Sequence, residues 1–385
     1  MLKAADIVQI VRSVVGPGPV AFCEASIGEA EAASVAACVR ENAVGYQAVD
    51  RLQSMISNIC GTEQGTAVSS GTAALHLALM AVGVRVGDEV LMPTLTFVAT
   101  ANAASYLGAI PHFVDSRDYD LGVAPFKLRR YLARIVEQQE GKPTNRRTGR
   151  HISAIVATHL LGHPAQIDEI AEIAAAHGIP LIEDAAEALG STFNGRPCGS
   201  FGAAGAISFN GNKIVTTNGG GAVLTNDPWI QAKVWTMATT ARLPHPWLME
   251  HSELAWNYRM GNINAALGLP QLERLGDLVG AKRRLAARYI DAFVGAAGAS
   301  TFIEREGCRS NYWLNAIMLD PHPTAAKRDE VLAALHTDGI GCRALFTPMH
   351  ELPFYKDNPR DNVEMAMDIW RRTVCLPSSA KLGAV

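Results

Sequence analysis

The chain of 385 residues has few charged residues and no excess of positive charge. Only 18% of its residues are Asp, Glu, Lys or Arg, and the formal net charge is −3. A nucleic-acid partner is therefore not expected, because such partners require a basic surface. The hydrophobic fraction is 48%, which is enough for a large core and argues against disorder. At this length the chain is expected to form two or three structural units.

The sequence also has no clear membrane-spanning or secretory segment. Its longest stretch without charged residues lies between Glu89 and Asp115, and the prolines and threonines there favour strand, helix and strand in a core. The start, Met1 to Pro17, carries Asp6 and Arg12 among apolar positions. This pattern is typical of a short amphipathic helix rather than of a signal peptide. We expect a cytoplasmic protein that does not bind a membrane.

Cysteine is sparse and scattered, with seven residues and no Cys-x-x-Cys or Cys/His spacing. Structural zinc sites and iron–sulfur clusters need such spacings, so no metal site is expected. Without a secretory signal, reduced thiols are the simplest interpretation of the seven cysteines.

Strand and helix patterns alternate through the first two thirds of the chain. Strands are expected near 66–69, 89–92, 110–114, 153–158, 179–183, 203–209 and 221–225, and helices near 72–83, 96–107, 124–138 and 166–177. This alternation predicts an α/β fold with a mostly parallel mixed sheet covered by helices. The polar stretch Gly141 to Arg150 is expected to be an exposed loop, with nucleotide contact as the alternative.

The pattern changes after about residue 245. Asn262 to Leu285 is expected to form one long helix, followed by a smaller α+β region. We therefore divide the chain into a large domain, residues 1–245, and a small C-terminal domain, residues 246–385. Packing of the N-terminal segment on the small domain is left open.

A carboxylate and a lysine follow two of the predicted buried strands. Asp184 ends the run from Ile179 to Ile182, and Lys213 follows the run from Ala203 to Phe209. Carboxyl ends of neighbouring parallel strands form the ligand crevice of an α/β sheet, so both side chains are expected in one pocket. Pyridoxal 5′-phosphate (PLP) uses this pair, because a lysine bonds its aldehyde and a carboxylate keeps its ring nitrogen protonated. The alternatives are a solvated loop lysine and a capping aspartate.

A candidate phosphate-binding segment lies upstream. Ser70-Gly71-Thr72 opens a segment rich in Ala and Leu, which are good helix formers. Gly71 permits a tight turn, and Thr72 suits a helix cap or first turn. The N-terminus of such a helix points free N–H groups at an anion, and the Ser208 hydroxyl can add to them. The alternative is an ordinary capped core helix.

Together, these segments resemble the DegT/DnrJ/StrS group of PLP-dependent nucleotide-sugar aminotransferases. The resemblance runs from about Gly61 to the C-terminus and implies the aspartate-aminotransferase-like fold. It depends on six ordered blocks: Ser70–Leu75, Gly87–Val90, Pro93–Ala103, Glu183–Ala186, Ser208–Lys213 and Trp256–Met260.

The resemblance implies a role for each matching position in the pocket. Lys213 is implied to be the Schiff-base lysine and to move the proton between cofactor and sugar, and Asp184 to pair with the pyridinium nitrogen. Phe97 is implied to lie over the ring face. Glu187 stands where many family members have Gln near the phenolic oxygen of the cofactor, so it is expected either to be protonated or to hydrogen-bond elsewhere.

The resemblance also implies how the cofactor phosphate is held. Gly71, Thr72 and Ser208 match the phosphate-binding positions of the family. Asn257 matches a position that reaches the phosphate from the neighbouring subunit. A homodimer with shared active sites is therefore expected.

A narrower resemblance concerns the substrate. Arg242–Trp247, Asn311–Asn315 and Thr347–Pro353 look like the branch that transfers an amino group from L-glutamate to C4 of UDP-linked 4-keto-6-deoxy-N-acetylhexosamines. That branch supplies legionaminic-acid and bacillosamine-type sugars for bacterial surface glycans such as lipopolysaccharide. Candidate sugar or nucleotide contacts are His159, Arg242, His245, Trp313, Asn315 and His350. For His159, a hydrogen-bonded turn histidine is an equal alternative.

Three alternatives of function remain at this point. The sugar is a GDP- or dTDP-linked 4-keto-6-deoxyhexose, or the protein binds PLP without catalysis, or it is a dehydratase of the same superfamily. Dehydratase members commonly replace the Schiff-base lysine with His, and Lys213 argues against that class.

Overall fold

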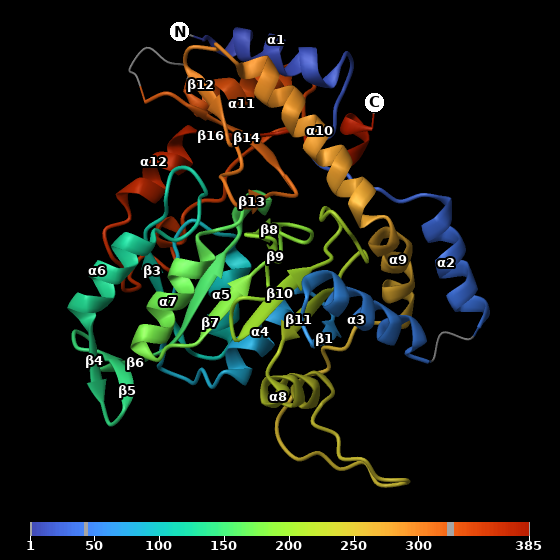
Figure 1. Cartoon of the computed structure of the whole chain (residues 1–385), viewed down its shortest axis with the longest axis vertical. Coiled ribbons are helices and arrows are strands. Elements are labelled where there is room, and N and C mark those ends of the chain that lie inside the picture. The colour runs from blue at the N-terminus through green and yellow to red at the C-terminus, as the bar shows by residue number, and fades with distance from the viewer. Residues whose placement is uncertain (1, 42–44, 322–326, 385) are drawn as a thin grey trace.

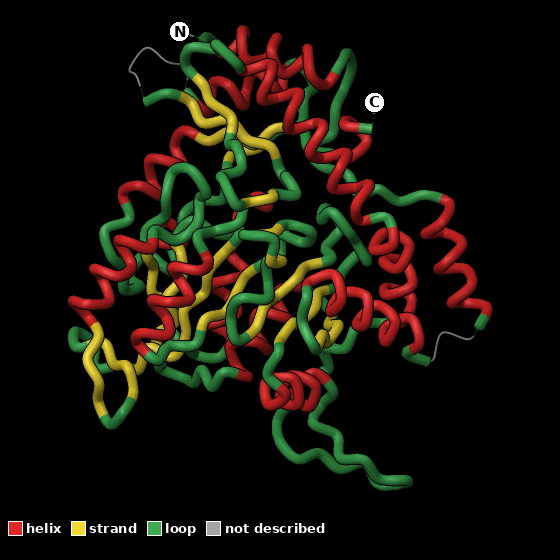
Figure 2. Tube along the Cα trace, in the orientation of Figure 1, coloured by secondary structure: helices red, strands yellow, loops and turns green. Residues whose placement is uncertain are grey.

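The computed structural model describes residues 2–41, 45–321 and 327–384. A large sheet covered by helices forms the body of the molecule, and a smaller antiparallel sheet lies at one end of it (Figure 1, Figure 2). The helices are α1 (Ala4–Val15), α2 (Glu29–Arg40), α3 (Gln47–Cys60), α4 (Gly71–Ala81), α5 (Val98–Tyr106), α6 (Pro125–Ile135), α7 (Ile167–His177), α8 (Pro228–Ala238), α9 (Asn262–Glu273), α10 (Leu275–Phe293), α11 (Arg328–Thr337) and α12 (Glu364–Arg372).

The strands fall into one large sheet and two smaller ones. The large sheet holds β1 (Gln64–Val68), β2 (Glu89–Pro93), β3 (Ile110–Val114), β4 (Val136–Gln139), β5 (Lys142–Asn145), β6 (Arg150–Thr158), β7 (Leu181–Asp184), β10 (Ala204–Ser208) and β11 (Gly221–Thr225). The smaller sheets hold β12 (Ala299–Thr301), β14 (Asn315–Leu319), β15 (Arg343–Ala344) and β16 (Thr373–Leu376), and β8 (Thr192–Phe193), β9 (Arg196–Pro197) and β13 (Cys308–Arg309).

The large sheet is mostly parallel, as the sequence predicts. Its main order is β1-β11-β10-β7-β6-β2-β3, in which β10, β7, β6, β2 and β3 pair in parallel and β11 is antiparallel to both of its neighbours. All seven strands lie close to the expected ranges. This topology places the carboxyl ends of the parallel strands along one edge, where α/β sheets bind their ligands.

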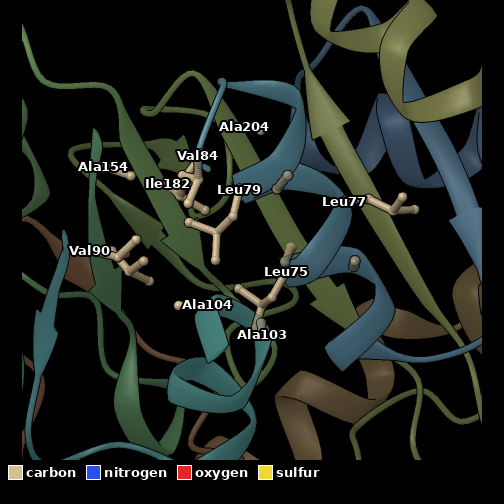
Figure 3. Close-up of a cluster of buried hydrophobic side chains, with 14 of the residues drawn as sticks. Leu75, Leu77, Leu79, Val84, Val90, Ala103, Ala104, Ala154, Ile182 and Ala204 are labelled. Carbon is tan, nitrogen blue, oxygen red and sulfur yellow. The ribbon is translucent and has the colours of Figure 1, made fainter. Parts of the chain in front are cut away.

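Both faces of this sheet are buried. Successive side chains of a strand point to opposite faces of the sheet. Val90 therefore packs in the hydrophobic core between the sheet and helices α4 and α5, and Leu91 packs in the hydrophobic core between the sheet and helices α6 and α7. Figure 3 shows Leu75 and Leu79 of α4 facing Val90 and Ile182 of the sheet. Most residues of α4 are buried, so apolar residues occur all round the helix rather than on one face.

The small sheet has its own core. Side chains of α1, α10 and α11 pack on β14 and β16, so the N-terminal helix lies against this C-terminal sheet (Figure 1). The amphipathic helix expected near the N-terminus is present as α1, with Ile7, Val11 and Val14 buried. The predicted domain boundary at residue 245 stays a prediction.

Two local predictions are wrong. The single helix expected over Asn262 to Leu285 is broken at Arg274, whose backbone (φ −104°, ψ 21°) is not helical. Pro270 lacks the N–H for one helical hydrogen bond within α9, and the Arg274 guanidinium contacts Glu31 at 2.8 Å.

The loop expected over 141–150 is wrong for Lys142–Asn145, which form β5 and pair with β4 in a hairpin, whereas residues 146–149 are an exposed turn as expected. Buried Glu89 accepts hydrogen bonds from Asn145 Nδ2 at 2.7 Å and Thr148 Oγ1 at 2.6 Å, and these bonds tie the hairpin to the large sheet. A buried carboxylate needs such donors, and the sequence pattern does not reveal the pairing.

Within the described ranges, no helix combines the length and the apolar character needed to cross a membrane.

Candidate active site

A cavity of about 260 Å³ lies at the carboxyl edge of the large sheet. Its wall includes Ser70 after β1, Thr158 at the end of β6, Asp184 at the end of β7 and Ser208 at the end of β10. Four strands thus each bring one polar side chain to the same space. This is the crevice that the strand order predicts.

Most residues expected to hold a cofactor line this cavity. They are Gly71, Thr72, Phe97, Asp184, Glu187, Ser208 and Lys213. Phe97 precedes α5, and its half-exposed ring lies 5.3 Å from the ring of Phe346 between centroids. Asn257 does not line the cavity, because it is exposed and forms an isolated bridge with Thr239.

The N-terminus of α4 forms a tight cradle at one end of the cavity. Ser70, rather than Thr72, is the capping residue, and its Oγ accepts from the N–H of Ala73 at 3.0 Å. The N–H groups of Gly71 and Thr72 have no acceptor within the helix and border the cavity. A Cβ on Gly71 would lie 2.8 Å from the Cβ of Ser208, so this close approach requires glycine. The arrangement suits an anion such as phosphate.

Asp184 is buried and held by two donors. Its Oδ2 accepts from Thr100 Oγ1 at 2.6 Å, and its Oδ1 accepts from the Ala186 N–H at 3.2 Å. Burial raises the pKa of the Asp184 carboxyl, and these hydrogen bonds with the charge of Lys213 oppose the shift only in part. A cationic partner in the cavity would stabilise the carboxylate form.

Lys213 lies opposite, in the turn that follows β10. Its Nζ is 3.5 Å from Glu187 Oε1 and 3.8 Å from the centre of the Trp313 ring. Trp313 in turn donates its indole N–H to the carbonyl oxygen of Asn212 at 2.8 Å, which fixes the turn. Burial lowers the pKa of the Lys213 ammonium, while the negative charges of Glu187 and Asp184 oppose that shift. A lysine with a lowered pKa is the more effective nucleophile and proton carrier near neutral pH.

Glu187 has a second hydrogen bond that the sequence does not reveal. Its Oε2 accepts from the backbone N–H of Leu161 at 2.7 Å, while Oε1 faces Lys213. Burial raises the pKa of Glu187, and the charge of Lys213 is the main opposing effect. Of the two expectations for this residue, hydrogen bonding elsewhere agrees with the Leu161 contact.

Among the expected substrate contacts, Trp313 lines the cavity. His159, Asn315 and His350 are buried, and each forms hydrogen bonds with other residues of the protein. His159 Nε2 lies 2.9 Å from Glu183, and its Nδ1 accepts from the Ala165 N–H at 3.1 Å, which places the proton on Nε2. Asn315 bonds Ser378, and His350 Nδ1 lies 2.6 Å from Thr94 Oγ1. The substrate roles of these three residues stay predictions.

Arg242 and His245 do not line this cavity; they belong to the segment after α8, which extends from the body of the molecule (Figure 1). The backbone of Arg242 forms an isolated antiparallel β-bridge with that of His251. His245 Nδ1 accepts from the N–H of Leu248 at 2.9 Å. The same segment exposes Trp247 and Leu254. These residues do not reach the cavity of their own chain.

Several residues of the site were missed from the sequence. Thr96, Thr158, Arg343 and Phe346 line the cavity, and Thr100 holds Asp184. Thr96 and Thr100 belong to the Pro93–Ala103 block of the family resemblance, so their hydroxyls could have been predicted as hydrogen-bonding groups of the cavity. Arg343 and Phe346 come from the small sheet and the loop after it, and no local pattern indicates that they reach this cavity.

The residues fit the PLP predicted from the sequence. The cavity joins a partly buried lysine, a buried carboxylate and an anion cradle whose glycines are enforced by close contacts. At Gly221, a Cβ would meet the carbonyl oxygen of Ser70 at 2.5 Å. Lys213 would bond the cofactor, Asp184 would face the ring nitrogen, and the α4 cradle would hold the phosphate.

The contact between Glu187 and Lys213 yields a testable prediction. Removing the charge in Glu187→Gln should lower the pKa of Lys213 further, because an opposite charge nearby favours the ammonium form. The measurement is the pH dependence of trinitrobenzenesulfonate labelling of Lys213 in cofactor-free protein, resolved by peptide mass spectrometry. Glu273→Gln, which removes an exposed partner of Arg51, is the control. An unchanged or higher pKa in Glu187→Gln would show that the pair is not coupled.

Comparisons with known proteins agree with this site. The model of the DegT/DnrJ/EryC1/StrS aminotransferase family matches residues 25–384. EpsN of Bacillus subtilis (strain 168), named for pyridoxal phosphate-dependent aminotransferase activity, is 36% identical over 338 residues, which are 87% of this chain and 84% of EpsN. The GDP-perosamine synthase of Escherichia coli O157:H7 is 36% identical over 324 residues, which are 83% of this chain and 82% of the synthase.

The fold agrees as well. The crystal structure of the aminotransferase TlmJ from Streptoalloteichus hindustanus superposes with a TM-score of 0.83 at 26% identity, covering 94% of each chain. The expected aminotransferase fold, a large mixed sheet with a smaller antiparallel C-terminal sheet, is therefore confirmed. The chain belongs to the DegT/DnrJ/EryC1/StrS aminotransferase family and is a PLP-dependent sugar aminotransferase.

Proposed function

We propose that this protein transfers the amino group of L-glutamate to C4 of a UDP-linked 4-keto-6-deoxy-N-acetylhexosamine, in the biosynthesis of a bacterial surface polysaccharide. The observation that carries the aminotransferase chemistry is the cavity that joins Lys213, Asp184 and the α4 cradle. The substrate assignment rests on the resemblance of Arg242–Trp247, Asn311–Asn315 and Thr347–Pro353 to that branch.

In this proposal each side chain has a distinct task. Bound PLP supplies an electron sink for the carbon that carries the amino group. Lys213 Nζ removes the proton from the α-carbon of glutamate and later delivers one to C4 of the sugar. Asp184, held by Thr100, stays anionic and keeps the cofactor ring nitrogen protonated.

Glu187 has a supporting task. Its carboxylate lies 3.5 Å from Lys213 Nζ and holds the ammonium when the amine carries a proton. The bond from the Leu161 N–H keeps Glu187 in place through this change. The half-exposed ring of Phe97 would cover one face of the cofactor and exclude water from it.

A GDP-linked 4-keto-6-deoxyhexose is the second candidate substrate. The specific observation in its favour is the 36% identity with a GDP-perosamine synthase. The two candidates share the ketone at C4 and differ in the nucleotide and in the group at C2. The chemistry at Lys213 is the same for both.

We further propose a homodimer with shared sites. Asn257 lies outside its own cavity, and the extended segment after α8 exposes Trp247, Met249 and Leu254, which is unusual for a surface in contact with water. In a two-fold dimer, Asn257 of one subunit would reach the cofactor phosphate of its partner.

Mixed dimers test this arrangement. Lys213→Ala should abolish turnover, and Asn257→Ala should weaken it strongly. A dimer of one Lys213→Ala subunit and one Asn257→Ala subunit keeps a single site with both native residues, so it should recover about half of the wild-type turnover. Differently tagged subunits are co-purified and assayed with L-glutamate and the keto sugar. No recovery in verified mixed dimers would contradict shared sites, and near-normal turnover of Lys213→Ala would contradict its catalytic role.

The substrate is tested by comparing kcat/KM for UDP-, GDP- and dTDP-linked 4-keto-6-deoxy sugars with L-glutamate as donor. The UDP-linked N-acetylhexosamine should be preferred by roughly a hundredfold or more, because sites built to hydrogen-bond a group reject analogues that lack it. The configuration at C4 follows from NMR coupling constants of the product. A preference for the GDP-linked ketone would establish the second candidate instead.

A further inference from the structure

A second cavity lies at the flank of the large sheet, outside the proposed active site. It has a volume of about 570 Å³ and is lined by α6, by the turn between β5 and β6, and by residues 360–362. Figure 1 shows α6, β3 and the β4–β5 hairpin together on one side of the molecule. None of the described residues that line this cavity lines the active-site cavity. A ligand bound here would therefore not contact Lys213.

Positive charge is concentrated in this second cavity, although the whole chain carries a net charge of −3. Arg134, Arg147 and Arg360 line it together with the carboxylate of Asp361, which leaves two positive charges in excess. Arg134 pairs with Asp361 at 2.9 Å. In the part of the chain that the structure describes, Arg147 and Arg360 form no ion pair. Two guanidinium groups are thus available to an external anion.

The turn that carries Arg147 is fixed by a buried carboxylate. Glu89 accepts from Asn145 and Thr148 on this turn, and also from His112 Nδ1 at 2.8 Å. Burial alone would raise the pKa of Glu89, but the hydrogen bonds from His112, Asn145 and Thr148 lower it below its ordinary value. Glu89 therefore stays anionic, and a carboxylate acceptor places a proton on His112 Nδ1.

His112 in turn fixes a tyrosine in the wall of the second cavity. Its Nε2 lies 2.7 Å from the hydroxyl oxygen of Tyr131, which is only 2% exposed. With the imidazole proton on the side of Glu89, neutral His112 accepts the hydroxyl proton of Tyr131. Burial and the charge of Asp361 raise the pKa of Tyr131 to about 12, and the nearby Arg147 opposes that shift. The hydroxyl oxygen is thus an acceptor that faces Arg147.

Arg360 is held from the other side by pairing with the edge strand β3. The N–H of Phe113 donates to the carbonyl oxygen of Pro359 at 2.9 Å, and the N–H of Asp361 donates to that of Phe113 at 2.9 Å. One guanidinium nitrogen of Arg360 donates to the carbonyl oxygen of Lys356 at 2.6 Å. Both unpaired arginines therefore lie on backbone segments that are fixed before a ligand binds, which lowers the cost of ordering them.

Two features of the second cavity oppose an anion. Asp361 is negatively charged, but Arg134 lies against it. The carbonyl groups at the C-terminal end of α6 carry partial negative charge. Those of Ile135 and Val136 already accept from Arg146, through its backbone N–H at 2.8 Å and its guanidinium at 2.7 Å. The two unpaired arginines therefore decide the sign of the charge that the cavity attracts.

We propose that Arg147 and Arg360 bind a diphosphate group, either as free pyrophosphate or as part of a nucleoside diphosphate. A guanidinium pairs with two oxygens of one phosphate, so two guanidinium groups match two linked phosphates. A diphosphate also carries at least the two negative charges that the excess positive charge requires. Tyr131 positions Arg147 for this contact. The site lies outside the proposed aminotransferase function and depends on none of its steps.

Calorimetric titration with inorganic pyrophosphate tests the site. The full chain is used with PLP bound, so that the cofactor phosphate occupies the α4 cradle. Arg147→Gln and Arg360→Gln should each weaken pyrophosphate binding roughly tenfold, as expected for the loss of a charge-assisted pair. Arg129→Gln, at an exposed arginine of α6 outside this cavity, is the matched control and should bind as the wild type does.

Tyr131→Phe tests the positioning of Arg147. Loss of the hydroxyl should weaken pyrophosphate binding about threefold in the wild-type background, and much less in Arg147→Gln, because the hydroxyl acts through that arginine. A merely structural defect would weaken binding equally in both backgrounds and would contradict the positioning role.

Titration with UDP distinguishes the two sources of the diphosphate. Binding of UDP that is tighter than that of pyrophosphate, and is weakened in Arg147→Gln, assigns the site to nucleoside diphosphates. A UDP titration that does not respond to Arg147→Gln assigns the site to free pyrophosphate, provided that pyrophosphate binding does respond.

Four outcomes would overturn the inference. The wild-type protein binds no pyrophosphate at millimolar concentration, or Arg129→Gln weakens binding as much as Arg147→Gln, which indicates non-specific attraction to surface charge. Weakening in Arg343→Gln alone would place the anion in the active-site cavity. Citrate that binds at Arg147 at least as tightly as pyrophosphate would identify a carboxylate ligand instead.

Discussion

The burial of Lys213 beside two carboxylates is the interaction on which the rest of the site depends. Asp184 and Glu187 are almost inaccessible to solvent, and Lys213 Nζ lies 3.5 Å from Glu187. Isolated buried charges are unfavourable, so each of the three requires the others or a hydrogen-bond donor such as Thr100. Glu187 holds the amine at 3.5 Å. Burial lowers the pKa of Lys213, toward the range where the amine can accept and release protons, and the two carboxylates oppose that shift.

The fold supplies this arrangement through the edge of one sheet. Parallel strands β10, β7 and β6 end side by side, so the residues that follow them meet in one cavity although they are distant in sequence. The small sheet and the segment before β14 complete the wall, because Arg343 lies on β15 and Trp313 lies just before β14. The indole of Trp313 donates to the backbone carbonyl of Asn212. Lys282, buried within α10, donates to the carbonyl oxygens of Trp313 at 3.1 Å and Ser378 at 2.6 Å and so fixes this part of the small domain. Movements of the small sheet would therefore act directly on the amine.

The sequence predicts the large sheet and the pocket well, because both follow from local patterns. Apolar runs of four to nine residues mark buried strands, and polar residues directly after them, such as Asp184 and Ser208, must lie at the carboxyl edge. The break at Arg274 and the hairpin tied to Glu89 depend on partners distant in sequence, so a local pattern does not reveal them. Arg343 was missed for the same reason, since β15 has only two residues and its position is set by pairing with β16. His159, Asn315 and His350 were singled out as polar residues near motifs, and the structure places them in buried hydrogen bonds.

The central claim is that Asp184 acts on the cofactor ring opposite Lys213, and the half-reaction with L-glutamate tests it most directly. Asp184→Asn keeps the shape of the side chain but loses its charge. We expect its first-order rate constant to fall at least about a hundredfold, since loss of a buried charge partner costs several kcal/mol and about 1.4 kcal/mol corresponds to a factor of ten. Asp277→Asn, at an exposed position of α10, should react at the wild-type rate. An unchanged rate constant in Asp184→Asn, with PLP still bound, would contradict the account.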